Sequence, residues 1–452
     1  MPHCACHSIH PFRCQFPGET VFFRVNEEDW CRFHLPLKST AGNPSPKATG
    51  KAGWEIGGSE RQAFDTEIHA RIRMATPRPQ GPSSIITRPD TRADLRGVAF
   101  PPRIVFSMIA DKLNVNFERA SFGDISSFSC ANFEDDANFT DVKLGANTSF
   151  AGATFEGEAS FAGASFGPFA NFYAATFNRH ASFRNAKFST LSNFDGAGFL
   201  EIADFSADKP TYPELDIGNL SFSETRFTGR CSFANRTFVG NASFNDAVFK
   251  DLVEFHGGTF HPGMSFHGTR FTRTRGNDDA ATEKLERSYR TLKRVMADLH
   301  ARNEEADFFA LEMECRRQRR DIGRIVPFVA IWYKRLSDYG RSVVRPLTWL
   351  GGLTALAFLF YAALFFWISG VIPGGPFRHL PAIFEFTLEQ MFSPFKIWFS
   401  PAGGKTIHEA VRVLLLEYYP PLVKILASLQ SLATIGLLTL FLLALRRRFK
   451  MD

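Results

Sequence analysis

The residues best suited to chemistry are cysteines and histidines near the start of the chain. Four of the seven cysteines lie within the first 31 residues, and a histidine follows the last of them at metal-ligand spacing. Thiolate and imidazole groups in pairs suit a tetrahedral zinc ion. Their spacing matches no named zinc motif, so the alternative of non-coordinating thiols in a poorly ordered tail stays open. The candidate zinc ligands are Cys4, Cys6, Cys14, Cys31 and His34.

The rest of the sequence lacks a catalytic pattern. It contains no nucleophile paired with a base and no nucleotide fingerprint, and GGK at 403–405 lacks the remainder of a phosphate loop. His256, His261 and His267 lie close in sequence at uneven phase, and we interpret them as solvated corner residues. We therefore expect a protein that is not an enzyme and requires no cofactor, with zinc as the one candidate metal.

Charge is distributed unevenly along the 452 residues, whose net charge is +6. Basic and acidic residues number 14 and 10 in residues 1–110, 14 and 19 in 111–275, and 24 and 17 in 276–452. A nucleic-acid binder more often carries a basic patch on its folded core. Because the central region is mildly acidic, we do not expect nucleic acid as the partner. The odd number of cysteines, without a visible secretory signal peptide, favours a reducing cytoplasm for most of the chain.

Phenylalanine recurs in a long, regular pattern. From Phe117 to Phe271 its spacing alternates between five and six residues, with one interruption at 206–221. The pattern has 27 positions, and 26 of them are Phe, with Leu144 the exception. The residue two positions earlier is usually alanine, so a large ring and a small neighbour can fill a narrow core. A fixed short period sustained over this length predicts a solenoid.

Stretches such as ANFEDDANF, ASFAGASF and ASFRNAKF resemble the pentapeptide-repeat family. The resemblance implies an all-β, right-handed, quadrilateral β-helix over residues 111–275, with one inward aromatic or leucine per side. The family's standard repeat is five residues long on every side. The alternation between five and six residues therefore predicts an extra residue on every second side, as a bulge or wider corner. About seven coils of 22 residues would form a rod on the order of 34 Å long. We interpret the break at 206–221 as a loop at one corner, with a binding loop as the alternative.

Upstream of the repeat, a Cys/His-rich segment at 1–35 precedes a linker at 36–110. Within this linker the pattern predicts a short helix over Ser59–Met74, with Ser59 as its N-cap. Its apolar residues at helical spacing are Phe64, Ile68 and Ile72.

Downstream, residues 277–323 predict a heptad helix capped by Asn277 and Asp278. Its seam either packs on the end of the β-helix as a lid or self-associates as a coiled coil. The seam consists of Leu285, Tyr289, Leu292, Met296, Leu299, Asn303, Ala306, Ala310 and Met313.

Residues 324–452 contain two long apolar runs, 347–369 and 425–445, neither of which carries a charge. Each is long enough to cross a hydrocarbon core of about 30 Å, so both are predicted transmembrane helices. Basic residues precede the first run and follow the second, which predicts a hairpin with both flanks cytoplasmic. Residues 331–335 are expected to form an interfacial segment. The basic residues are Lys334, Arg335, Arg341, Arg345, Arg446, Arg447, Arg448 and Lys450.

The segment between the runs resembles, in layout alone, the two-helix pore module of bacterial ion channels. Its stretch PAIFEFTLEQMF is semi-helical and breaks at Pro394, but the potassium filter TVGYG is absent. A polar stripe on the second run packs helices together or, in the alternative, lines a pore. The stripe consists of Ser428, Gln430, Ser431, Thr434, Gly436 and Thr439.

These patterns predict a membrane-anchored scaffold in the bacterial inner membrane, with both termini cytoplasmic. We expect membrane lipid as one partner, homo-oligomers through the heptad helix or the spans, and a protein partner that the sequence does not name. The alternative is an oligomeric ion channel or pore with a cytoplasmic β-helix. Some soluble members of the family mimic DNA and protect topoisomerases, but the central region is too weakly acidic to mimic a duplex.

Overall fold

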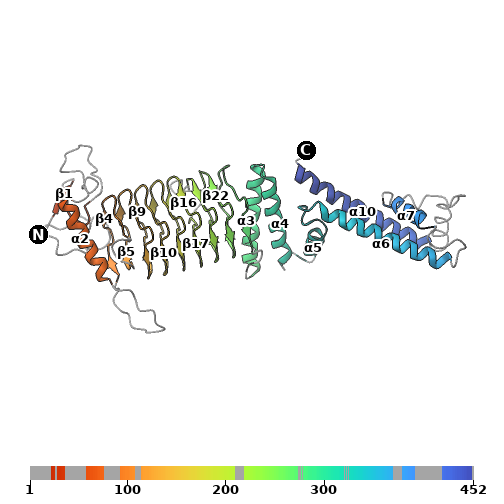
Figure 1. The fold of residues 1–452 in the computed structure, drawn as a ribbon, viewed down its shortest axis with the longest axis horizontal. Coiled ribbons are helices and arrows are strands. Elements are labelled where there is room, and N and C mark those ends of the chain that lie inside the picture. Colours follow the sequence, from red (N-terminus) through yellow and green to blue (C-terminus); the bar gives the residue numbers. More distant parts are fainter. Residues whose placement is uncertain are drawn as a thin grey trace, which may run out of the picture. The chain divides into compact units, whose positions relative to one another are not determined.

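The computed structural model describes residues 22–25, 28–35, 58–75, 92–106, 113–208, 218–272, 276, 278–319, 321, 323, 325–369, 379–391 and 420–449. The chain divides into two compact units, Met1–Val295 and Met296–Asp452. Short parallel strands dominate the first unit and helices the second, as Figure 1 shows for each of them.

The first unit is a parallel β-solenoid of about seven turns, from Ala93 to Phe271. Its strands are two residues long, and most pair with the strand 22 residues further on, as Phe155 pairs with Phe177. Each coil therefore adds one rung to each of four ladders.

The first ladder contains β3 (Ala93–Asp94), β5 (Val115–Asn116), β8 (Ala137–Asn138), β11 (Ala159–Ser160), β14 (Ala181–Ser182), β18 (Ala203–Asp204), β21 (Cys231–Ser232) and β24 (Val253–Glu254). The second contains β4 (Ala99–Phe100), β6 (Ser121–Phe122), β9 (Lys143–Leu144), β12 (Ser165–Phe166) and β15 (Lys187–Phe188). The third begins as single bridges at Val105 and continues as β16 (Ser192–Asn193), β19 (Leu220–Ser221) and β22 (Ala242–Ser243). The fourth contains β7 (Asn132–Phe133), β10 (Thr154–Phe155), β13 (Thr176–Phe177), β17 (Gly198–Phe199), β20 (Arg226–Phe227), β23 (Val248–Phe249) and β25 (Arg270–Phe271).

The solenoid begins earlier than the predicted boundary at residue 111. Strands β3 and β4 pair with β5 and β6, so residues 92–106 belong to the first coil and not to a linker. Leu95, Phe100 and Phe106 are fully buried there. Counted backwards from Phe117 in steps of six and five, the pattern skips position 111 and then meets Phe106, Phe100 and Leu95. The sequence prediction missed this continuation.

The core is a set of stacked phenylalanine rings. Each ring lies parallel to the ring one coil away, as Phe150 and Phe172 do, with centroids 4.8 Å apart and planes at 3°. Rings on opposite faces of one coil meet edge to face, as Phe161 and Phe172 do at 5.6 Å and 90°. The separation between neighbouring parallel strands is close to the separation between the centroids of two stacked rings. Flat rings can therefore fill the core on every rung. A tyrosine there would bury a hydroxyl without a partner, which explains why one aromatic type dominates.

The corners explain the alternating spacing. The five-residue step from Phe128 to Phe133 contains a β-turn closed by the Ala131 N–H on the Phe128 carbonyl, 3.0 Å, with Cys130 at φ 57°. In the six-residue step from Phe122 to Phe128, the Ser126 hydroxyl donates to the Gly123 carbonyl at 2.7 Å, and the Ile125 N–H bonds to the Ala146 carbonyl of the next coil. The extra residue therefore forms the wider corner that the sequence predicted.

The break in the repeat is an insertion of six residues. Ser192 pairs with Leu220, 28 positions later, and the offset returns to 22 beyond it. The inserted segment at 209–217 lies outside the described residues. Beside this break, Arg236 takes the inward position normally held by alanine, fully buried, and donates to the Ala186 carbonyl at 2.6 Å.

Helix α2 (Ser59–Met74) covers the first coil. Phe64, Ile68 and Ile72 are buried as predicted, and the Phe64 ring meets Phe100 edge to face at 5.9 Å. The N-cap residue is Gly58, so the predicted N-cap, Ser59, is instead the first helical residue. Preceding α2, β1 (Phe22–Val25) and β2 (Glu28–Cys31) form an antiparallel hairpin.

Helix α3 (Asp279–Asp298) packs on the last coils. Ser288 Oγ accepts the Phe255 N–H at 3.0 Å, and Tyr289 meets Phe271 edge to face. Asp278 caps the helix through the Ala281 N–H, as predicted, whereas Asn277 lies outside the described residues. These contacts agree with the prediction that the helix packs on the end of the β-helix as a lid. Leu285, Tyr289 and Leu292 are buried.

A continuous heptad helix over residues 277–323 is not formed. Helix α3 ends at Asp298, His300 adopts φ 58°, and α4 (Arg302–Gln318) then begins a new helix. The predicted seam is therefore divided between two helices.

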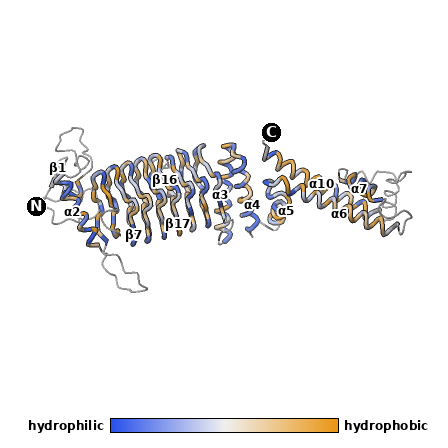
Figure 2. Tube along the Cα trace, in the orientation of Figure 1, coloured by the Kyte–Doolittle hydropathy of each residue, from blue (hydrophilic) through white to orange (hydrophobic). Residues whose placement is uncertain are grey.

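The second unit continues with α5 (Ile325–Ser337), α6 (Val344–Ser369), α7 (Leu380–Glu389) and α10 (Pro420–Phe449). Figure 2 shows the apolar character of α6 and α10 along nearly their whole lengths. The two helices pack together with α7 around a buried cluster that includes Tyr361, Phe365, Ile383 and Phe386.

Candidate functional site

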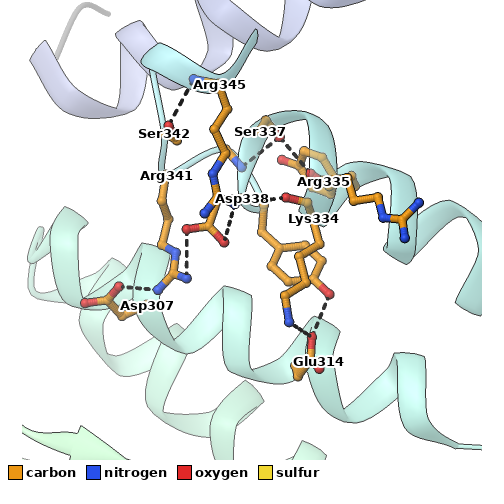
Figure 3. Close-up of polar contacts among 12 residues, drawn as sticks. Asp307, Glu314, Lys334, Arg335, Ser337, Asp338, Arg341, Ser342 and Arg345 are labelled. Atoms are coloured by element: carbon orange, nitrogen blue, oxygen red, sulfur yellow. Dashed lines mark hydrogen bonds and ion pairs between the residues drawn. The ribbon is translucent and has the colours of Figure 1, made fainter. Parts of the chain in front are cut away.

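The most connected polar cluster in the described second unit joins α4, α5 and the start of α6, and we call it the polar joint. It comprises Asp307, Glu314, Arg317, Lys334, Ser337, Asp338, Tyr339, Arg341 and Arg345, most of which Figure 3 shows. At its centre, the Glu314 carboxylate on α4 accepts bonds from Lys334 Nζ and from the Tyr339 hydroxyl, each at 3.0 Å. Arg317, one turn along α4, forms an ion pair with the same carboxylate.

These partners set the protonation state of Glu314. Burial alone would raise the pKa of Glu314, but the bonds from Arg317, Lys334 and Tyr339 outweigh burial and lower this pKa to about 2. Burial and the adjacent Glu314 carboxylate raise the pKa of Tyr339. Glu314 is therefore a permanent anion at neutral pH, and Tyr339 is a permanent hydrogen-bond donor.

A tight turn connects α5 to α6 at this cluster. Asp338, Tyr339 and Gly340 all have positive φ, of 52°, 57° and 81°. A buried tyrosine in the left-handed region is strained, and the Glu314 bond together with the Gly340 N–H on Ser337 Oγ at 3.1 Å holds it there. The turn thus has one defined conformation.

The outer part of the joint consists of three ion pairs between two arginines and two aspartates. Arg341 contacts Asp307 on α4 at 3.0 Å and Asp338 at 3.2 Å, and Arg345 contacts Asp338 at 3.4 Å. The geometry of the polar joint supports a mechanical role, in which α4, α5 and the first turn of α6 hold a fixed mutual orientation.

The predicted polar stripe is partly used to hold α7. Gln430 donates to the Thr387 carbonyl at 3.0 Å and accepts from the Tyr361 hydroxyl at 3.2 Å. Ser431 donates to the Gln390 carbonyl. Carbonyls at the last turn of a helix lack intrahelical partners, so these side chains of α10 satisfy the carboxyl end of α7. This arrangement favours helix packing for Gln430 and Ser431.

The other stripe residues have different surroundings. Ser428 and Thr439 donate to carbonyls of their own helix, at Lys424 and Ile435. Thr434 is buried, and its hydroxyl has no hydrogen-bond partner among the described residues. A Cβ at Gly436 would meet open space. The structure therefore does not unite the six residues in one site, and their pore-lining role remains a prediction.

Two of the five candidate zinc ligands are described, and they lie together. Cys31 Sγ is 3.0 Å from His34 Nδ1, and both residues are buried at the end of the β1–β2 hairpin. The Phe33 carbonyl beside them accepts the Ala99 N–H of β4, so this segment is packed on the solenoid rather than forming a loose tail. Cys4, Cys6 and Cys14 lie outside the described residues. Among the described residues, no group of three ligand-type side chains converges, so zinc remains a prediction.

The remaining cysteines and histidines form no second cluster in the described structure. His256 and His261 are half-buried and His267 is exposed, all within the last coils, and His261 Nδ1 accepts the Gly263 N–H at a turn. Burial raises the pKa of the Cys231 thiol, with Asp204 and Glu254 adding to it, so this thiol is unreactive. The polar joint itself was missed from sequence, because its members are spread over about 40 residues and only the fold brings them together.

In the part of the chain that the structure describes, α6 and α10 contain two segments that are long and apolar enough to cross a membrane, Val344–Trp367 and Pro421–Arg446. Length and composition alone support this assignment. The predicted runs at 347–369 and 425–445 fall within these two helices.

Residues 117–165 match the family model described as "Pentapeptide repeats (9 copies)". No curated protein and no solved structure shows significant similarity to the chain. The matched segment lies within the solenoid, so the repeat type and the parallel β-solenoid agree with each other.

Proposed function

We propose that this pentapeptide-repeat protein is a membrane-anchored scaffold, in which α6 and α10 form a hairpin through the bacterial inner membrane and the solenoid displays a binding surface in the cytoplasm. The observation that carries the proposal is the exposed apolar surface of the two long helices. Leu356, Leu359 and Trp367 on α6 are more than 60% exposed, and Leu429 and Leu442 on α10 more than 55%. Surfaces of this kind are rare on soluble monomers and typical of lipid contact.

The solenoid supports a binding role rather than catalysis. Its interior is filled by stacked rings, and both ends are covered, by α2 and by α3. Such a rod offers a long, rigid outer surface whose side chains are spaced by the strand ladder. The polar joint would then fix the direction in which α4 leaves the membrane. The partner is proposed to be another protein, and the chain is proposed to act as a homo-oligomer without a cofactor.

An oligomeric channel is the second candidate, and the placement of α7 favours it. This short helix lies between α6 and α10 in the sequence, packs in one cluster with both, and is held at its carboxyl end by Gln430 and Ser431. A short helix between two spans is the layout of a pore module. Within one copy, however, Gln430 and Ser431 are engaged with backbone carbonyls, so a pore would have to form from other residues or between copies.

The test starts with membranes of cells that express the full chain. Retention of the protein after an alkaline carbonate wash is expected for a hairpin anchor, and release would overturn the proposal. Cross-linking in these membranes, followed by identification of what co-purifies, should recover a specific protein. Reconstitution into planar bilayers distinguishes the candidates, because a scaffold gives no conductance and a channel gives discrete currents.

A further inference from the structure

Helix α5 has an outer apolar face that the described part of the second unit leaves uncovered. Ile325, Phe328, Val329 and Trp332 follow helical spacing, and their exposures range from 41% for Trp332 to 78% for Ile325. On the opposite face, Ala330 is fully buried in a cluster with residues of α4 and the turn. The helix is therefore fixed from one side and presents apolar side chains on the other.

A positive charge stands at the edge of this face. The Arg335 guanidinium lies 5.9 Å from the centre of the Trp332 ring. Figure 3 shows Arg335 pointing away from the polar joint. Lys334, Arg341 and Arg345 each have a carboxylate partner, whereas within the described residues none is recorded for Arg335. Its charge is thus available to an external anion.

The outer face of α5 continues onto the start of α6. Trp349 Nε1 of α6 donates to the Arg335 carbonyl at 3.3 Å, and Val344, Leu347 and Trp349 are exposed apolar residues. Tryptophan is enriched where helices enter a bilayer, because its ring is apolar and its N–H is polar. The two tryptophans and Arg335 therefore lie at the level at which α6 would enter the membrane.

We propose that α5 lies in the membrane interface and binds anionic phospholipid, with its apolar face among the acyl chains and Arg335 on the headgroup phosphate. Lipid is favoured over a protein partner because the face is continuous with the exposed surface of α6 and carries an available cation. The inference rests on the proposed function, since α5 meets lipid only if α6 crosses the bilayer. A cation near an anionic surface gives about a fivefold preference for the charged lipid.

The experiment uses the full chain in vesicles that contain equal parts of phosphatidylcholine and phosphatidylglycerol. A photo-reactive p-benzoylphenylalanine replaces Phe328, and a second variant carries it at Phe169, a solenoid phenylalanine that is also about half exposed. Irradiation should cross-link position 328 to lipid, with phosphatidylglycerol enriched over phosphatidylcholine. Position 169 should give no lipid adduct.

Arg335→Gln should reduce the phosphatidylglycerol enrichment at position 328 about fivefold. Arg335→Lys should retain most of it, because the charge remains. The matched control is Arg287→Gln, which removes one exposed arginine from α3 and should leave the enrichment unchanged.

Adducts to protein instead of lipid at position 328, or equal enrichment in the wild type and Arg335→Gln, would overturn the inference. If the protein stays in the membrane after a carbonate wash while position 328 gives no lipid adduct, only this inference fails and the anchor stands. Release by carbonate would remove both.

Discussion

At the scale of single residues, the phase of the phenylalanine count decides which rings belong to the core. Phe172 is fully buried between Phe150 and Phe194, whereas Phe169, three residues earlier, is 51% exposed at a wide corner with φ 63°. Phe172 belongs to the five/six count of phenylalanines, whereas Phe169 does not. The buried position of Phe183 follows the same count.

This difference predicts unequal costs for the same substitution. Phe172→Ala and Phe183→Ala should each lower the free energy of unfolding by ~3–5 kcal/mol, because a buried ring is lost and a cavity remains. Phe169→Ala should cost on the order of 1 kcal/mol or less. Denaturant melts of a fragment spanning residues 22–298, which retains both covering helices, measure this ranking. Equal losses at Phe169 and Phe172 would contradict the inward-ring assignment.

The polar joint predicts a pH-dependent stability. The pKa of Glu314 is about 2 in the fold and higher when the chain unfolds, so its ionised form stabilises the fold. That contribution is fully present above the unfolded pKa, near 4, and is lost as the pH falls towards 2. Glu314→Gln should therefore lower the melting temperature at pH 7, and the gap to the wild type should narrow below about pH 4. A difference in melting temperature that stays constant from pH 7 to pH 3 would argue against a stabilising role for the ionised Glu314 carboxylate.

The zinc prediction can be tested on the buried pair at the N-terminus. If residues 1–35 bind zinc, the protein purified under reducing conditions without chelator should contain the metal. Cys31→Ser and His34→Ala should remove it, while Cys130→Ser, an exposed cysteine of the solenoid, should not. Absence of zinc from the wild type would leave Cys31 and His34 as packing residues of the hairpin.

At the scale of elements, prediction succeeded where one periodic pattern determined the structure. The regular five/six spacing of phenylalanine predicted the solenoid and its wide corners, and the two apolar runs predicted α6 and α10. The start of the solenoid was missed because only Leu95, Phe100 and Phe106 continue the count beyond a skipped position. The heptad pattern was misleading, since spacing does not reveal that the chain turns at His300.

The role of α3 as a cover makes a prediction about association. Leu292 is fully buried on this helix, whereas Ala297 on the same helix is exposed. Leu292→Asp places an uncompensated charge in the core and should cost on the order of 3 kcal/mol or more. It should also uncover the last coil, whose unpaired strand edges favour end-to-end association. Light scattering of the same fragment should show large species for Leu292→Asp and none for Ala297→Asp, and monomers in both would count against the cover.

At the scale of the whole molecule, charge around the two long helices sets the expected topology. Lys334, Arg335, Arg341 and Arg345 precede or open α6, and Arg446 to Lys450 supply four further basic residues at the end of α10. Positive residues near a span are retained on the cytoplasmic side, so both outer flanks should share that side. The pairing of α6 with α10 in one cluster agrees with a hairpin.

Reporter fusions after residue 340 and after residue 452 should therefore both report a cytoplasmic position, and a fusion between the two helices, after residue 391, should report the periplasm. Replacing the four basic residues at 446–448 and 450 with glutamine should weaken the retention of that end and give a mixed signal after residue 452. The same number of substitutions in the solenoid, at Arg179, Arg184, Arg226 and Arg230, should leave all three signals unchanged, because the rule acts only near a span. A periplasmic signal after residue 340 in the wild type would place the solenoid on the opposite side of the membrane, and the cytoplasmic scaffold would then be wrong.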